Sequence, residues 1–183
     1  MAVTITLFEK SQWCFSISIR PVGLSLHPED IFIRLGIQAD AARICDVYLL
    51  SRKHFLPYAP LAHSDFEVRD WVENKLLVTA DVFVVEQDGD ITAMMALTRD
   101  GSAGWIDQLY LHPRVVGQGI GSQLVSLAKN KLGAPVLLYT FQANTAARRF
   151  YERHAFVPIL FGDGSGNEEK CPDVLYEWKT EAI

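Results

Sequence analysis

The stretch LYLHPRVVGQGIGSQLV, residues 109–125, is the most informative part of this 183-residue chain. It starts as an apolar strand pattern, passes through a turn with three alternating glycines, and continues with apolar residues at helical spacing. Gly117, Gly119 and Gly121 place several backbone N–H groups at a helix start, where they lack helical partners and no Cβ atom blocks approach. Because a helix amino terminus carries partial positive charge, we predict an anion-binding site at this turn.

Two familiar phosphate-binding loops do not match this turn. The dinucleotide fingerprint GxGxxG would need glycine where Ser122 stands, and no acidic residue follows at the required distance. A nucleoside triphosphate loop would need a lysine that GQGIGSQ lacks. Arg114 can add a full positive charge beside the turn, in the spacing R-x-x-G-x-G. A plain tight turn that packs the helix onto a sheet is the open alternative.

Outward from the turn, the periodic segments predict alternating strands and helices. One helix starts at Asp40 as its cap, carries Ala41, Ile44, Tyr48 and Phe55 on one face, and ends before Pro57 and Pro60. The expected strands lie at residues 31–37, 81–86, 91–97, 105–111, 136–141, 156–161 and 173–178. The run VLLYTF at 136–141 is typical of a strand covered on both faces.

Three further helices complete the expected order. The first begins at a Ser64–Glu67 capping box, with Val68, Trp71, Val72 and Leu76 as its buried stripe. The second begins after the glycine turn and stops at Gly133 and Pro135. Asn144 caps the third, which runs to about His154 with Ala147, Phe150 and Tyr151 on its apolar face. The order predicts one α/β or α+β domain with a mixed sheet.

Composition agrees with one folded domain. Apolar residues make up 49% of the chain, and the net charge of -5 argues against general binding to nucleic acid or acidic membranes. Charged residues interrupt every apolar run, so we expect no membrane helix, and the amino terminus is a poor signal peptide, which favours a cytoplasmic protein. Residues 1–30, with strand-like TITLF and CFSISI, read as an appendage to a domain at 31–183.

Cysteines and histidines give no sign of a disulfide framework or a metal site. Cys14, Cys45 and Cys171 are odd in number and lack CxxC spacing, so each is expected to behave as a small hydrophobe. The histidines at 54, 63 and 112 lack ligand spacing.

Two motifs together resemble the GNAT superfamily of acyl-CoA-dependent N-acetyltransferases. The first is the strand-turn-helix segment already quoted, and the second is NTAARRFYERHAF, similar to the family pattern N-x-x-A-x-x-x-Y-x-x-x-G-F. Asn144, Ala147, Tyr151 and Phe156 match the pattern, whereas Ala155 stands where the family usually has glycine, which puts the left-handed helix terminus in doubt. The ending DGSGNEEKCPDVLYEW is similar to that of some bacterial members.

The resemblance implies a single GNAT-like domain, with a central mixed, mostly antiparallel sheet of about seven strands and helices on both faces. It also implies a splay between the fourth and fifth strands, where acetyl-CoA would place its thioester as acyl donor. Asn144 is favoured as a helix cap whatever the function. The coenzyme-binding residues implied are Leu109, Tyr110, Leu111, Arg114, Val116, Gly117, Gln118, Gly119, Ile120, Gly121, Ser122, Asn144 and Tyr151.

The resemblance also implies roles in catalysis. Tyr151 would protonate the leaving thiolate, although a tyrosine on an apolar helix face is commonly a core residue. The attacking amine needs a base or a water chain; Asp107 is one candidate, and Glu168, Glu169 and Asp173 follow in a glycine-rich acidic loop that is otherwise simply solvated. Direct attack in a ternary complex is expected, because no cysteine lies within the motifs to form an acyl-enzyme.

The expected partner is a small-molecule or peptide amine, and the acidic composition favours a cationic one. A homodimer through the amino-terminal strands stays open. The alternatives from other classes are a non-catalytic CoA-binding sensor or interaction module on the same fold, and a structural domain whose glycine turn binds nothing.

Overall fold

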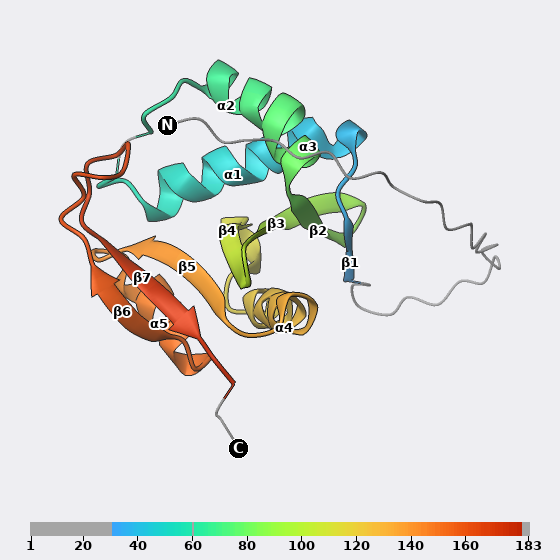
Figure 1. Cartoon of the computed structure of the whole chain (residues 1–183). Coiled ribbons are helices and arrows are strands. Elements are labelled where there is room, and N and C mark those ends of the chain that lie inside the picture. Colours follow the sequence, from blue (N-terminus) through green and yellow to red (C-terminus); the bar gives the residue numbers. More distant parts are fainter. Residues whose placement is uncertain (1–30, 60, 181–183) are drawn as a thin grey trace.

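A seven-stranded sheet lies between two layers of helices in the computed structural model, which describes residues 31–59 and 61–180 (Figure 1). The strand order is β1-β2-β3-β4-β5-β7-β6, and only β4 and β5 are parallel neighbours. The strands are β1 (Phe32–Leu35), β2 (Asp81–Gln87), β3 (Asp90–Asp100), β4 (Ala103–Leu111), β5 (Val136–Phe141), β6 (Val157–Phe161) and β7 (Asp173–Trp178). The predicted mixed, mostly antiparallel α+β domain is confirmed.

The helices cover both faces of the sheet, as predicted (Figure 1). The first layer consists of α1 (Ala41–Phe55), α2 (Asp65–Trp71), the π-helical turn η2 (Val72–Leu76) and α3 (Leu77–Thr79). The second consists of α4 (Ile120–Leu132) and α5 (Thr145–Arg153). The segment predicted as one helix from Ser64 onward is therefore interrupted by a wider turn at η2.

Alternate residues of β2 enter two separate cores. Val82 and Val84 pack among the buried residues of α1, α2 and η2, whereas Phe83 and Val85 face the core formed with α4 and α5. Side chains of successive strand residues point to opposite faces, so a strand buried on both faces is apolar throughout. This arrangement fixes the central strands firmly between the two helix layers.

The prediction that β5 is covered on both faces is wrong. Tyr139 is 53% exposed, and its ring stacks on Trp105 of β4 at 6.0 Å between centroids. The helix α1 packs against β3 and β4, and β5 lies beyond it in the strand order. One face of β5 is consequently left open beside β4.

Asp40 does not cap α1 as expected. Its carboxylate accepts a hydrogen bond from the Ile37 backbone N–H at 2.9 Å and pairs with Arg34 at 2.6 Å. It therefore stabilises the turn before the helix and ties it to β1. The helix ends at Phe55 before Pro57, as predicted, although Phe55 is exposed rather than buried.

Other predicted helix ends are confirmed. Ser64 and Glu67 form the expected capping box, the Asn144 side chain accepts from the Ala147 N–H, and Gly133 ends α4. The strands expected within residues 1–30, Cys14 and Pro60 lie outside the described residues. Within the described part of the chain, no helix combines the length and apolar character needed to cross a bilayer.

Ala155 keeps the left-handed conformation that glycine would adopt after α5. Its φ is 58°, and its N–H bonds to the Glu152 carbonyl in the turn that ends the helix. The substitution in the second motif therefore leaves the helix terminus intact, at the expense of a conformation that is unfavourable for a residue with a Cβ atom.

Candidate active site

The strands β4 and β5 separate soon after they meet. They are paired only at Gly104–Val136 and Trp105–Leu137, so the rest of β4 has no partner strand on this side among residues 31–59 and 61–180. Its other side stays paired with β3 as far as Leu111. The predicted splay between the fourth and fifth strands is confirmed, and it leaves backbone groups of β4 free to bind another chain or ligand.

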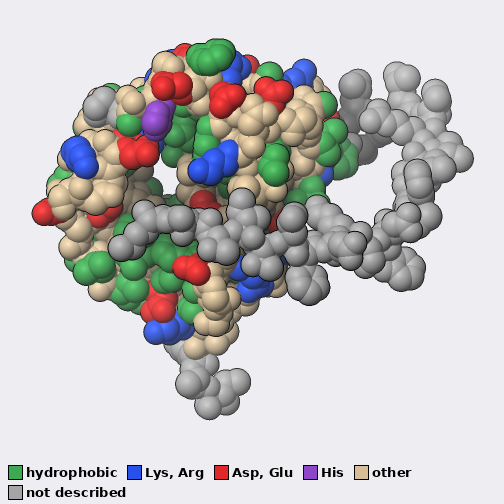
Figure 2. Space-filling view, turned by 45° about the horizontal axis from the view of Figure 1, so that its top comes forward, with side chains coloured by type: hydrophobic (Ala, Val, Ile, Leu, Met, Phe, Trp, Pro, Cys, Tyr) green, Lys and Arg blue, Asp and Glu red, His purple; other side chains and the backbone are tan. Residues whose placement is uncertain are grey.

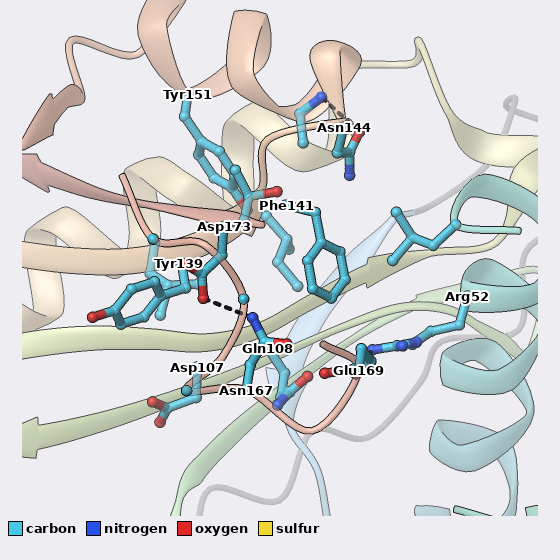
Figure 3. A pocket seen from close by; sticks show the side chains of 18 of the residues that line it. Arg52, Asp107, Gln108, Tyr139, Phe141, Asn144, Tyr151, Asn167, Glu169 and Asp173 are labelled. Carbon is cyan, nitrogen blue, oxygen red and sulfur yellow. Dashed lines mark hydrogen bonds and ion pairs between the residues drawn. The ribbon is translucent and has the colours of Figure 1, made fainter. Parts of the chain in front are cut away.

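A cleft of about 630 Å³ opens at this divergence (Figure 3). Its walls come from β4 and β5, the carboxyl end of α1, the first two turns of α5, and the loop of residues 162–172 between β6 and β7. Among the predicted site residues, the cleft brings together Asp107, Leu109, Tyr110, Asn144 and Tyr151.

Asp107 owes its position to a β-bulge. Ala96 of β3 pairs with Gln108 and Leu97 pairs with Ile106, so Asp107 is the extra residue on β4. A bulge bends its strand and redirects a side chain. Loss of solvent around the carboxylate raises the pKa of Asp107, and a hydrogen bond with Thr98 opposes part of this shift.

Tyr151 reaches the cleft from the core side of α5 (Figure 3). It is only 8% exposed, and its ring contacts Phe150 and Phe156 edge-on. Burial raises the pKa of Tyr151 well above that of a free phenol, and the nearby Tyr110 hydroxyl adds to the rise. Among the described residues, none hydrogen-bonds to the Tyr151 hydroxyl. The group is thus a protonated donor without a hydrogen-bond partner in the described part of the chain.

Asn144 has one donor group to spare. Its side-chain oxygen accepts from the Ala147 N–H at 3.1 Å, which is the predicted helix cap. The cap leaves the side-chain amide N–H groups for a ligand in the cleft, so Asn144 can cap α5 and also bind the coenzyme.

The glycine turn has the expected shape but lies outside the cleft lining. Gly117 and Gly119 have φ values of 88° and 84°, and both face open space where a Cβ atom would stand. Gly119 is the N-cap of α4, and no described side chain caps this end, so the first N–H groups of the helix are available to an anion. Gly121 packs near the ring of Phe150, which explains the third glycine by close helix contact.

Several predicted coenzyme residues use their side chains elsewhere. Ser122 Oγ lies 3.0 Å from His154 Nε2, and Gln118 donates to the Arg114 carbonyl. Arg114 pairs with Asp90 at 3.2 Å, and both side chains are exposed. Exposed ion pairs of this kind contribute little, so Arg114 can exchange this partner for a ligand. Leu111, Val116 and Ile120 likewise lie outside the cleft lining.

The acidic loop divides between the cleft and the surface. Glu169 and Asp173 line the cleft, whereas Glu168 points away from it and pairs with His63 at 2.9 Å. On the face shown in Figure 2, the described Lys and Arg side chains are scattered among acidic ones rather than gathered into a continuous basic patch.

Arg52 is the functional candidate that sequence reasoning missed. It lies in the last turn of α1, is almost fully buried, lines the cleft and pairs with Glu169 at 2.8 Å. In the sequence, SRKHF resembles an ordinary basic helix end. Only the tertiary structure distinguishes Arg52 from exposed Lys53.

The described residues contain no group of three or more His, Cys, Asp or Glu side chains that could hold a metal ion. Cys45 lies on the buried face of α1, and Cys171 Sγ lies 3.7 Å from the Tyr58 carbonyl. Neither cysteine lines the cleft.

Residues 79–158 match the model of the acetyltransferase (GNAT) domain family. This range includes the splayed strands, the glycine turn and the Asn144–Phe156 motif. The match identifies residues 79–158 as similar to a GNAT acetyltransferase domain.

Solved structures share the fold at low sequence identity. The PaiA N-acetyltransferase of Thermoplasma acidophilum, in complex with coenzyme A, is 20% identical with a TM-score of 0.65, covering 82% of this chain and 99% of its own. YncA of Salmonella typhimurium, with acetyl-CoA, is 19% identical with a TM-score of 0.64, over 84% and 96% of the two chains. Apo YjaB of Escherichia coli is 19% identical with a TM-score of 0.65, over 81% and 97%. No curated protein sequence matches significantly.

Proposed function

We propose that this protein transfers the acetyl group of acetyl-CoA to a primary amine by direct attack within a ternary complex. The observation that carries the proposal is the opening between β4 and β5, with Asp107 and Tyr151 both lining it. Two proteins of the same fold have been solved with coenzyme A and with acetyl-CoA, which supports this donor.

The coenzyme would be held mainly by backbone groups. The uncapped start of α4 offers N–H groups to the diphosphate from Gly117 to Ser122, and Arg114 lies three residues before this segment begins. The unpaired side of β4 at Leu109–Leu111 offers a strand edge to the pantetheine arm. Asn144 would contribute its amide N–H groups at the cleft.

Chemistry in the cleft needs a proton donor and a proton acceptor. Tyr151 stays protonated because burial raises its pKa, and it would supply a proton to the leaving sulfur. Asp107 would take the proton of the attacking ammonium; its raised pKa makes it a stronger base than an ordinary aspartate. An N–H of β4 would stabilise the oxyanion, an interaction worth about 3 kcal/mol in other acyl transfers.

Thiol release tests this function. Purified protein with acetyl-CoA and a panel of primary amines is expected to release free coenzyme A thiol only when an accepted amine is present. Coenzyme A that binds tightly without thiol release on any amine would instead favour the non-catalytic binding module. Calorimetry without any heat on addition of coenzyme A would contradict both.

A further inference from the structure

Arg52 places a nearly buried cation in the wall of the cleft. Its side chain is 6% exposed, and its guanidinium lies 6.0 Å from the ring centroid of Tyr48 and 5.9 Å from that of Phe141. Aromatic faces at this distance favour the cation and hold the flat group in one plane. A buried charge of this kind is expensive to keep unless it is paired.

The donors of Arg52 are incompletely used. Among the described residues, Nε is buried and has no hydrogen-bond partner. One terminal nitrogen reaches the Ala59 carbonyl at 3.4 Å, and the guanidinium also hydrogen-bonds to the Tyr110 side chain. A guanidinium offers five N–H donors in a fork that matches a carboxylate with two parallel hydrogen bonds. The ion pair with Glu169 engages the other terminal nitrogen.

Glu169 occupies the place where a carboxylate ligand would meet this fork. It comes from the glycine-rich loop 162–172 and is more exposed than Arg52, at 18%. Figure 3 shows the Arg52–Glu169 pair at one end of the cleft and Asp107 at the other. A ligand carboxylate in the cleft would therefore compete with Glu169 for the same donors.

We propose that the acceptor is an amine that also carries a carboxylate, and that this carboxylate displaces Glu169 from Arg52. The inference rests on the proposed acetyl transfer and specifies the substrate class of the same cleft. Arg52 thereby determines the specificity for the acceptor, and the Glu169 carboxylate occupies the position of the ligand carboxylate before the ligand binds.

The charges of the cleft fit a zwitterion. Among the described residues that line it, Arg52 is the only lysine or arginine, and its partner Glu169 leaves three further carboxylates, those of Asp107, Asp163 and Asp173. An ammonium directed to the Asp107 end and a carboxylate directed to Arg52 would each meet a group of opposite charge (Figure 3). An acceptor without a carboxylate would leave the Arg52–Glu169 pair in place.

Binding of matched ligands tests the proposal without requiring turnover. Calorimetry would compare α-, β- and γ-amino acids with their primary carboxamides, titrated into the protein in the presence of coenzyme A, which has no acetyl group to transfer. We expect at least one amino acid to bind about tenfold or more tightly than its carboxamide, as a charge-assisted hydrogen bond allows. Equal affinities, or no binding by any amino acid, would overturn the proposal.

Variants give opposite expectations for the two partners. Arg52→Gln is expected to abolish the preference for the carboxylate. The readout is the ratio of the amino acid and carboxamide dissociation constants within one variant, because a uniform loss of folded protein does not change this ratio. Glu169→Gln is expected to strengthen amino acid binding, because the competing carboxylate is gone. Weaker binding of both ligands by Glu169→Gln would show that Glu169 binds the ammonium or only supports the loop, and would refute the displacement.

Matched controls come from the neighbouring residues. Lys53→Gln removes an exposed cation that pairs with Asp65, and Glu168→Gln removes the exposed partner of His63. Both are expected to retain the wild-type preference. If no amine gives thiol release but amino acids still bind more tightly than carboxamides, the proposed acetyl transfer is wrong and the carboxylate site at Arg52 is supported. If amines are acetylated but amino acids bind no more tightly than carboxamides, only the carboxylate site at Arg52 is wrong.

Discussion

Replacing Tyr151 with phenylalanine removes a single oxygen atom from the cleft. The ring and its edge contacts with Phe150 and Phe156 remain, and no described residue loses a hydrogen bond. We therefore expect the free energy of unfolding to change by less than about 0.5 kcal/mol. The coenzyme affinity should also be preserved, because backbone groups provide most of the proposed binding.

The expected effect falls on the chemical step. A positioned general acid contributes roughly 10²- to 10⁴-fold, equivalent to about 2.7 to 5.4 kcal/mol of barrier. Tyr151→Phe should accordingly lower kcat by about 100-fold or more, as measured by thiol release at saturating acetyl-CoA and amine. Calorimetric affinity for coenzyme A should stay within about twofold of wild type.

Tyr176 provides the matched control. Its hydroxyl donates to Glu152 at 2.7 Å and accepts from Arg148 at 3.2 Å, on a fully buried ring in β7 outside the cleft lining. Tyr176→Phe should lose about 1 kcal/mol of stability and keep kcat. A Tyr151→Phe protein with wild-type kcat, or an equal loss of kcat in both variants, would refute the acid role of Tyr151.

Three other predictions concern the turn, a strained residue and an ion pair. Gly119→Ala should lower the free energy of unfolding by about 1 kcal/mol and weaken coenzyme A binding severalfold in calorimetry. Gly101, which also has a positive φ and open space around it, is the control: Gly101→Ala should lower stability by a similar amount and leave coenzyme A binding unchanged. Ala155→Gly should raise the free energy of unfolding by up to about 1 kcal/mol in urea titrations, because φ is 58°. The hydrogen-bonded Arg34 lowers the pKa of Asp40, so its contribution is present above the unfolded pKa near 4 and is lost as pH falls through the lowered folded value. Asp40→Asn should therefore destabilise by about 1 kcal/mol at pH 7, with the difference from wild type shrinking toward pH 2.

Local patterns were sufficient for most of the fold. Residues 81–111 contain three apolar runs separated by Asp-Gly turns, and the structure forms three antiparallel strands from them. The capping box at Ser64 and the stop at Gly133 depend on backbone N–H and C=O groups within one turn, so short-range sequence determines them.

Features that depend on distant partners were not predictable in the same way. Asp40 was expected at a helix cap, but Arg34 on β1 and the Ile37 N–H take its carboxylate. The exposure of Tyr139 follows from where α1 lies over the sheet, which the apolar run at 136–141 does not encode. Tertiary packing determines the contacts of Asp40 and the exposure of Tyr139, because the local sequence is compatible with more than one arrangement of each side chain.

The candidate site shows the same division. The glycine turn and the Asn144–Tyr151 spacing are local and were recognisable. The bulge that directs Asp107 arises from pairing with β3, and the buried Arg52 side chain contacts Phe141 and Glu169, which lie far away in the sequence. Neither leaves a periodic signal in the sequence.

A crystal structure of the protein with coenzyme A bound is the most direct test of how the cleft and the helix start work together. The expected result is a diphosphate within hydrogen-bond distance of the N–H groups of residues 119–122, with the thiol between β4 and β5 beside the Tyr151 hydroxyl. A diphosphate bound away from α4, or a thiol outside the β4–β5 opening, would contradict the account.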